Sequence, residues 1–406
     1  MDRATTESKK IFYLSISIVL SISMLVYYKY TEFLLENLFS LIGYEWESNL
    51  GIILPVGISF FTFQTMSYSI DLKRGNIPVC KSLPKYMLFV AFFPQLVAGP
   101  IVRATEFIPQ LSEKIKITLP NLLIGGQLFL GGAIQKVIFS DNLSSYADTV
   151  FSQPELFSTG TLWLSAIAYA MQIFCDFSGY SLMAIGIAKT LGFHLPENFR
   201  MPYISLSVTE FWRRWHKTLS FWLRDYLYIS LGGNRKGKIR QDFNLLITMI
   251  LGGLWHGASW NFVIWGSAHG LALIVHKFWE KRTRSWCHSI KKSIYYKVIA
   301  WASTFIFVLL LWIPFRAENF TITLNYFIGM FSFSHEGISW INPNVLVVLL
   351  CIIFWHFLFI VKSNSLLQFP LLKLDRLYPQ LVISFVILAL LLFVPLNSSP
   401  FIYFQF

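Results

Sequence analysis

Apolar runs long enough to cross a lipid bilayer recur along almost the whole of this 406-residue chain. A helix needs about 20 residues to cross roughly 30 Å of hydrocarbon. Lipid offers no hydrogen-bond partner to the backbone, so each of these runs must form a helix. The alternating pattern of an outer-membrane barrel is not seen in the sequence. These features predict an all-α polytopic membrane protein with a single domain over residues 1–406.

Composition and charge support this prediction. The chain is 55% hydrophobic and 17% aromatic, and only 13% of its residues are charged, which is unusual for a soluble protein. The net charge of +12 could indicate nucleic-acid binding, but the basic residues are spread over short loops between apolar runs. Membrane topology explains the charge better, so we expect the bilayer, and no nucleic acid, as a partner.

The four cysteines show no paired spacing typical of a disulfide framework or a metal site, and we expect them to be packing residues: Cys80, Cys175, Cys287 and Cys351. The histidines likewise share no metal-ligand spacing, so no bound metal is expected.

Membrane segments are expected at eight places. The start, MDRATTESKKIFYLS, has no small-residue cleavage site after it and is predicted to be a retained first helix. The expected spanning or partly spanning segments are 11–30, 51–70, 120–140, 161–188, 244–279 as a hairpin, 296–314, 344–361 and 379–399.

The charges of the loops predict the sidedness of these segments. Lys9 and Lys10 precede the first span, and Lys73 and Arg74 follow the second, so both places are expected in the cytoplasm. The loop expected after 120–140 carries Asp141, Asp148 and Glu155 without Lys or Arg, which predicts an external position.

The stretch YMLFVAFFPQLVAGP, residues 86–100, is too short to span and contains the helix breakers Pro94, Gly99 and Pro100. Irregular backbone at membrane depth must be surrounded by protein or a wet cavity, so a re-entrant segment inside the fold is predicted. Arg103 is then expected at the mouth of a cavity.

An amphipathic helix is predicted in the basic stretch 201–240. An aromatic stripe at helical spacing contains Trp212, Trp215, Leu219, Trp222 and Tyr226. The opposite face carries Arg213, Lys217 and Arg224. Such a helix lies in the membrane interface, and a simple surface anchor is one interpretation. His216 lies at the edge of the stripe, where it can turn toward the protein interior.

GLWHGASW, residues 253–260, places a histidine deep in an apolar region. Basic residues lie before residue 244 and after residue 276, so both ends of this segment are expected in the cytoplasm. The segment must therefore enter the membrane and return. Twelve helical steps separate Asn244 from His256, about 18 Å, which predicts a position near the bilayer midplane.

A titratable side chain at that depth indicates a functional site, although a neutral histidine that joins two helices is the structural alternative. Trp255, Asn261 and the flanking glycines favour a cavity. Asp176 is expected to support the cavity wall through a basic or hydroxyl partner, and a satisfied core hydrogen bond is an equal alternative. His269 and His276 are predicted to make packing or pore-side hydrogen bonds. No role is assigned to His194, His288, His335 and His356.

Four stretches carry a resemblance to a known family: FFPQLVAGPIVRATEF (92–107), FCDFSGYSLMAIG (174–186), FWRRWHKTLSFWLRDYLYISLGGNR (211–235) and GLWHGASWNFVIWGSAHG (253–270). They resemble the membrane-bound O-acyltransferases, especially the bacterial branch of the alginate O-acetylation membrane subunit and the lipoteichoic acid D-alanine transferase. The resemblance covers about residues 50–280 and continues weakly to the end. It implies a ring of tilted helices with re-entrant segments around a central tunnel, in a bacterial cytoplasmic membrane.

The resemblance implies that His256 matches the near-invariant family histidine and His216 the second polar position. We expect His256 to act as general base and His216 to orient the thioester carbonyl or donate to the oxyanion. The residues expected to line the substrate path are Trp255, Trp215, Arg213, Lys217, Arg224, Asp225, Asn261, Asp176 and Arg103.

The leading hypothesis is an O-acyltransferase, expected to be an O-acetyltransferase that acts on an envelope polysaccharide or a relay protein. No cofactor is expected to be bound; acetyl-coenzyme A or an acyl carrier protein would be the co-substrate, and the resemblance implies an extracytoplasmic hydrolase-like partner. D-alanyl transfer to teichoic acid is an alternative. A transporter with a histidine proton relay is the rival of another class, but no second copy of the WHG hairpin is present. An inactive scaffold is a third reading.

Overall fold

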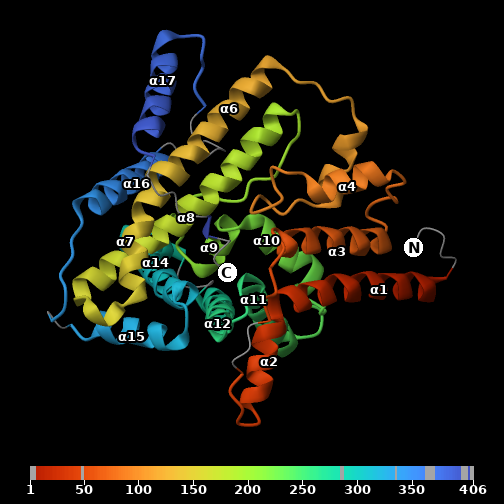
Figure 1. Cartoon of the computed structure of the whole chain (residues 1–406), viewed down its shortest axis with the longest axis horizontal. Coiled ribbons are helices and arrows are strands. Elements are labelled where there is room, and N and C mark those ends of the chain that lie inside the picture. Colours follow the sequence, from red (N-terminus) through yellow and green to blue (C-terminus); the bar gives the residue numbers. More distant parts are fainter. Residues whose placement is uncertain are drawn as a thin grey trace.

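The computed structural model describes residues 6–46, 50–283, 288–333, 336–361, 371–394 and 401–402. These residues are mainly helical (Figure 1) and include one isolated bridge between Phe157 and Ile338. The α-helices are α1 Glu7–Leu25, α2 Thr31–Ser40, α3 Ile58–Arg74, α4 Leu83–Ala91, α5 Ala104–Phe107, α6 Leu119–Ala133, α7 Asp141–Ser152, α8 Thr159–Thr190, α9 Val208–Arg214, α10 Lys217–Trp222, α11 Lys238–His256, α12 Trp260–Thr283, α13 His288–Lys292, α14 Ile294–Arg316, α15 Phe320–Phe331, α16 Pro343–Val361 and α17 Leu377–Leu392. The π-helical segments are η1 Val26–Tyr30, η3 Ile134–Ser140 and η6 Leu223–Tyr228, and the 3₁₀ turns are η2 Pro109–Ser112, η4 Pro154–Leu156 and η5 Pro202–Ile204.

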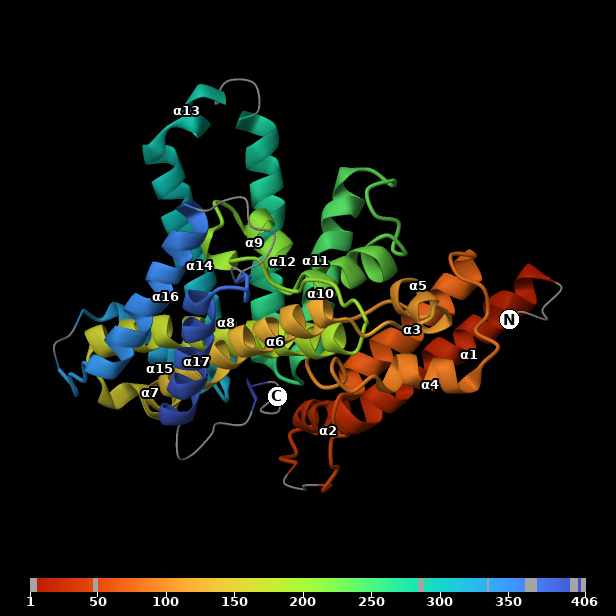
Figure 2. The ribbon, with the colours of Figure 1, turned by 90° about the horizontal axis from the view of Figure 1, so that it is seen from above.

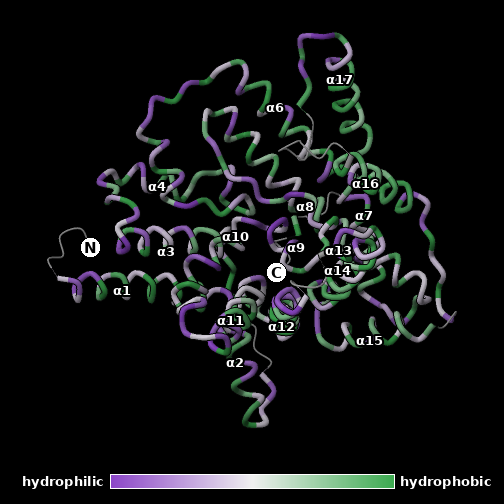
Figure 3. The backbone as a smooth tube through the Cα atoms, turned by 180° about the vertical axis from the view of Figure 1, so that it is seen from behind, coloured by the Kyte–Doolittle hydropathy of each residue, from purple (hydrophilic) through white to green (hydrophobic). Residues whose placement is uncertain are grey.

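The prediction of a polytopic helical membrane protein is confirmed. Within the described ranges, five helices are long and apolar enough to cross a membrane: Glu7–Ser40, Leu119–Ser152, Thr159–Thr190, Ile294–Arg316 and Pro343–Ile360. They contain five of the predicted segments. Figure 3 shows that hydrophobic residues also dominate the shorter α17. The long helices are not parallel: α12 and α14 stand upright in Figure 2, whereas α1 and α3 are inclined beside them.

Contacts between helix ends confirm that the basic segments gather on one side. Lys73 at the end of α3 lies 3.8 Å from Glu7 at the start of α1, so these two helices are antiparallel. Arg74 donates to the carbonyl of Asp225 at 3.1 Å, and Lys277 pairs with Asp242 at 2.6 Å. We call the side that carries these contacts the basic side; the loop charges predict that it is cytoplasmic.

Two segments differ from the predicted boundaries. The helix expected at 120–140 continues through η3 into α7, so Asp141 and Asp148 lie on a helix and not in an external loop. The segment lacks glycine and proline from Ile134 to Ser152, so nothing in it stops the helix. The span expected at 51–70 begins at Ile58, because Gly57 adopts a left-handed conformation with φ +77°.

The single amphipathic helix expected through the aromatic stripe is wrong. The chain breaks at Trp215 and His216, between α9 and α10, where His216 has φ +39°. Two backbone bonds to a distant segment hold this break: Arg200 N–H donates to the Arg214 carbonyl and Lys217 N–H to the Asn198 carbonyl, both at 2.9 Å. The stripe residues are consequently buried in the protein core rather than facing lipid.

The predicted hairpin is confirmed. Helices α11 and α12 pack so closely that only glycine fits at position 253: a Cβ there would lie 2.3 Å from the Phe262 carbonyl oxygen. The turn lies level with the end of α14, since Asn261 donates to the Ala317 carbonyl at 3.0 Å. His256 therefore lies near the end of α14, and its ring centroid is 5.1 Å from that of Phe315. The re-entrant prediction for 86–100 agrees with the structure: α4 ends at Ala91 and a mostly buried irregular segment follows.

Candidate active site

His256 forms the end of α11 and is 4% exposed. The last carbonyls of a helix have no partner within it, and here side chains of η1 supply the donors. Lys29 Nζ donates to the carbonyls of Trp255 and His256 at 2.8 and 2.7 Å, and the Tyr30 hydroxyl donates to the Leu254 carbonyl at 2.6 Å. These three bonds, which we call the α11 clamp, fix the backbone that carries the histidine.

A cavity of about 130 Å³ reaches this histidine. The segment before α3 and the first residues of that helix bound the cavity. The basic side lies at the other end of α3, where Lys73 and Arg74 are found. The lining residues are Lys29, Leu54, Pro55, Val56, Gly57, Ile58, Ser59, Phe60, Val97, Trp255 and His256. His256 is thus accessible from the side opposite the basic segments.

Trp255 is the common neighbour of His256 and His216. Its ring centroid lies 5.0 Å from that of His256 and 6.0 Å from that of His216. The indole is held in turn by stacking on Phe63 at 5.3 Å. His216 is fully buried, and its Nδ1 lies 3.1 Å from Oδ1 of Asn198. Two histidines far apart in the sequence therefore meet one tryptophan.

A larger groove, of about 740 Å³, lies on the basic side, between the α9–η6 region and the α11–α12 hairpin. Three of its residues are basic: Arg213, Arg224 and Lys277. Its deepest named residue along α11 is Met249, seven residues before His256 and so about 10 Å away along the helix. The complete lining is Thr209, Trp212, Arg213, Ser220, Phe221, Leu223, Arg224, Tyr228, Gln241, Leu245, Thr248, Met249, Leu273 and Lys277.

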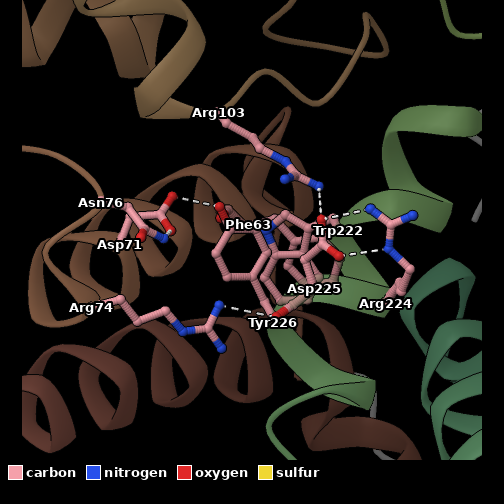
Figure 4. Close-up of polar contacts among 9 residues, drawn as sticks. All are labelled: Phe63, Asp71, Arg74, Asn76, Arg103, Trp222, Arg224, Asp225 and Tyr226. Carbon is pink, nitrogen blue, oxygen red and sulfur yellow. Dashed lines mark hydrogen bonds and ion pairs between the residues drawn. The ribbon is translucent and has the colours of Figure 1, made fainter. Parts of the chain in front are cut away.

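Arginines cluster beside this groove around Asp225 (Figure 4). Arg103 pairs with Asp225 at 2.8 Å, and Arg224 binds the same carboxylate at 2.6 and 3.0 Å. Arg103 and Arg74 also lie 5.3 and 5.6 Å from the ring centroid of Tyr226, within the range of cation–π contact. The predicted residues Arg103, Arg224 and Asp225 are thus brought together.

The charge state of Asp225 follows from these contacts. Burial alone would raise the pKa of Asp225, but hydrogen bonds from Arg224 and Arg103 outweigh it and hold that pKa below its ordinary value. The carboxylate stays ionised at neutral pH and neutralises part of the surrounding positive charge.

Other predicted residues lie elsewhere. Lys217 was expected on the basic face of an interfacial helix, but its ammonium pairs with Glu197 within the protein. Asn261 fixes the hairpin turn through Ala317 rather than lining the cavity. Asp176 has the basic partner expected of it, since it pairs with Lys136 of η3 at 2.6 Å. Asp176 lies on α8, faces η3 and does not line either of the two cavities described above.

The aromatic and histidine predictions can be placed in the same way. Trp215 is buried and contacts Phe199 and Trp312 at centroid distances of 5.0 and 4.9 Å. His269 accepts from the Trp212 indole at 3.3 Å, as predicted for a packing hydrogen bond. His276 lies 2.9 Å from the Thr209 hydroxyl. His335 lies outside the described residues.

Three residues of the site were not predicted from the sequence: Lys29, Tyr30 and Asn198. A lysine near the end of a span is typical of a side chain that reaches the interface, so Lys29 gave no signal of its own. Asn198 lies in a loop without a motif. Their partners are remote in sequence; Lys29 and Trp255 are 226 positions apart.

Comparison with known proteins identifies the family. The model of the MBOAT, membrane-bound O-acyltransferase, family matches residues 76–315, which include His216, His256 and the groove. The chain belongs to this family, so the resemblance found in the sequence is confirmed.

Several bacterial proteins are similar to this chain. It is 43% identical over 333 residues to a protein named "Probable alginate O-acetylase AlgI" from Azotobacter vinelandii, covering 81% of this chain and 65% of that protein. It is 38% identical over 347 residues to the peptidoglycan O-acetyltransferase of Helicobacter pylori, covering 79% and 65%. It is 30% identical over 247 residues to the teichoic acid D-alanyltransferase of Streptococcus thermophilus, covering 57% and 58%. The chain thus spans slightly less than two thirds of the length of these relatives.

Proposed function

We propose that this protein is a membrane O-acyltransferase that moves an acetyl group from a cytoplasmic thioester donor to a hydroxyl of a cell-envelope polysaccharide or of a relay protein. The observation that carries the proposal is that two cavities approach His256 from opposite sides. The small cavity opens away from the basic side, and the large basic groove ends about 10 Å along α11 from the same residue. Two substrates held on opposite sides of a membrane need this arrangement.

The chemistry assigned to His256 is general base catalysis. A neutral imidazole accepts the proton of the acceptor hydroxyl while the hydroxyl oxygen forms a bond to the thioester carbonyl carbon. The tetrahedral intermediate then collapses and the carbon–sulfur bond breaks. The deacylated donor leaves as a thiolate, which takes the proton from His256. The α11 clamp supports this role because it fixes the position of the base relative to the cavity.

The groove is assigned to the donor. Acetyl-coenzyme A and an acyl carrier protein both carry the acyl group on a phosphate-linked pantetheine arm, which is long and thin. Arg213, Arg224 and Lys277 supply positive charge for the phosphate. An extracytoplasmic hydrolase-like partner and a location in a bacterial cytoplasmic membrane belong to the same proposal; the similar proteins named above come from bacteria.

The test is mass analysis of envelope polymers from cells with and without the protein, which names the acyl group and the acceptor. The variant His256→Gln should abolish acylation at normal protein levels. His356→Gln is the matched control, because His356 is also a buried membrane histidine and its Nδ1 lies 2.8 Å from the Ile352 carbonyl of its own helix.

Normal acylation in the His256→Gln variant contradicts the assignment of the base. D-alanyl esters in place of acetyl esters support the alternative, teichoic acid D-alanylation. Identical polymers together with a changed solute gradient support a transporter instead.

A further inference from the structure

The protonation of His216 is set by a residue that lies outside every motif noted in the sequence. His216 adopts a left-handed backbone conformation and is 0% exposed, so its ring cannot exchange partners with water. Its Nδ1 lies 3.1 Å from Asn198 Oδ1. A hydrogen bond there needs one donor and one acceptor, and the orientation of the Asn198 amide decides which atom has which role.

Three contacts orient that amide. The backbone N–H of Thr218 points at Asn198 Oδ1 at 3.3 Å, and a backbone N–H can only donate. The Thr218 hydroxyl donates to the same oxygen at 2.9 Å. On the other side, Asn198 Nδ2 donates to the Ser181 hydroxyl at 3.0 Å. A flipped amide would place an NH₂ group against the Thr218 N–H, so the oxygen must face His216.

We infer that Asn198 is a positioning residue that fixes His216 as the Nδ1–H tautomer, so that Nε2 presents a lone pair to a bound substrate. The oxygen of Asn198 accepts, therefore His216 Nδ1 donates, and a neutral imidazole with its proton on Nδ1 has none on Nε2. Within the described part of the chain, His216 Nε2 is buried and has no hydrogen-bond partner.

This tautomer changes the role predicted for His216. Donation to an oxyanion needs a proton on Nε2, which the neutral ring does not carry in this arrangement. The ring lies 4.6 Å from Phe177 and 6.0 Å from Trp255 by centroid distance, so its surroundings are apolar and favour the neutral form. His216 is therefore an acceptor for an N–H group. The pantetheine arm of a thioester donor carries amide N–H groups, and this assignment of the ligand depends on the proposed function.

Nitrogen-15 NMR of the full-length protein in lipid bilayers, with labelled histidine at neutral pH, measures the tautomer directly. The protonated and lone-pair nitrogens of a neutral imidazole have well-separated shifts, and a His216→Gln sample identifies the signals by their loss. The expected result is one neutral form with the proton on Nδ1. A proton on Nε2, or on both nitrogens, overturns the inference.

Two variants test the part assigned to Asn198. Asn198→Leu removes the acceptor and should replace the single form with a mixture of tautomers, whereas Asn198→Asp keeps an oxygen acceptor and should keep a proton on Nδ1. Ser181→Ala is the matched control, since Thr218 still orients the amide. A pure Nδ1–H form in Asn198→Leu refutes the positioning role. If that variant does not fold, the wild-type and Asn198→Asp spectra still decide the question.

Activity gives a second, separate readout. At metal sites, loss of a residue that orients a ligating histidine typically costs about 10- to 100-fold in activity, and we take the same range for His216. We expect acyl transfer in Asn198→Leu to fall in this range while Ser181→Ala stays near the wild-type rate. If the spectrum shows the Nδ1–H form but the protein transfers no acyl group, the inference about the tautomer stands and the proposed function is refuted.

Discussion

The α11 clamp makes Lys29 the most informative position outside the family motifs. Replacing Lys29 with Met keeps the length and apolar stem of the side chain but removes the ammonium that binds the carbonyls of Trp255 and His256 at 2.8 and 2.7 Å. A hydrogen bond to a charged group contributes about 1.5–3 kcal/mol in soluble proteins. Intramembrane hydrogen bonds average about 0.6 kcal/mol. Twice the intramembrane average and twice the lower soluble value bracket the contribution of the two bonds to the end of α11 at about 1–3 kcal/mol.

Each 1.36 kcal/mol corresponds to about a tenfold change in rate, so full expression of this loss in the transfer step predicts about a 5- to 150-fold decrease for Lys29→Met. Tyr30→Phe removes one neutral bond, to the Leu254 carbonyl, and at about 0.5–1.5 kcal/mol should cost about 2- to 12-fold. The two substitutions thus predict an order of effects as well as a size.

The assay is the acyl content of envelope polymers in cells whose only copy is the variant, divided by the amount of variant protein in the membrane. Lys10→Met is the matched control, because Lys10 lies on the same helix, at its opposite end, and pairs with Glu7 at 3.2 Å near the surface. A wild-type acyl content per molecule in Lys29→Met would refute the reasoning, even if less of that protein accumulated.

Three further predictions follow from single contacts. Gly253→Ala places a methyl group 2.3 Å from the Phe262 carbonyl oxygen, so α11 and α12 must separate; we expect a loss of about 1–3 kcal/mol, seen as a lower melting temperature in detergent, while Gly126→Ala, with nothing within 4 Å, stays near wild type. Because the pKa of Asp225 is held below its ordinary value, its stabilising effect is complete above about pH 4 and is lost as the pH falls through the lower folded-state pKa; the melting difference between wild type and Asp225→Asn should be constant from pH 5 to 8 and shrink on stronger acidification. His216→Gly and His216→Ala both lack the ring, but only glycine tolerates φ +39° without strain, so His216→Gly should be more stable by about 1 kcal/mol and have the higher melting temperature. Equal melting temperatures would mean that the backbone there is not left-handed.

The membrane helices could be predicted from the sequence because hydrocarbon leaves the backbone one local solution. The pattern of apolar residues therefore carried the information for α8, α14 and α16 almost to their ends. It was less informative about α7, where acidic residues suggested a loop. Asp141 is compatible with a helix because Lys136, one turn before it, pairs with it at 2.8 Å.

His256 could be found in the sequence for a related reason. Burying a titratable group in an apolar hairpin is costly, and that cost is visible from composition alone. Helix α11 begins at Lys238, six residues before Asn244, so His256 closes a longer helix than the segment predicted from residue 244. The turn after His256 is bonded to Ala317, and the His256 carbonyl accepts from Lys29, two contacts that the apolar pattern does not predict.

The second histidine shows where local patterns fail. Periodicity through FWRRWH assumes that one helix continues, and every residue in that stretch is compatible with a helix. The helix breaks because Arg200 and Asn198, in a separate loop, form backbone bonds with Arg214 and Lys217. The same loop supplies the amide that orients His216. The strain at His216 and the orientation of its ring thus have one cause, so the backbone and the imidazole are positioned together, and neither can be read from the motif that contains them.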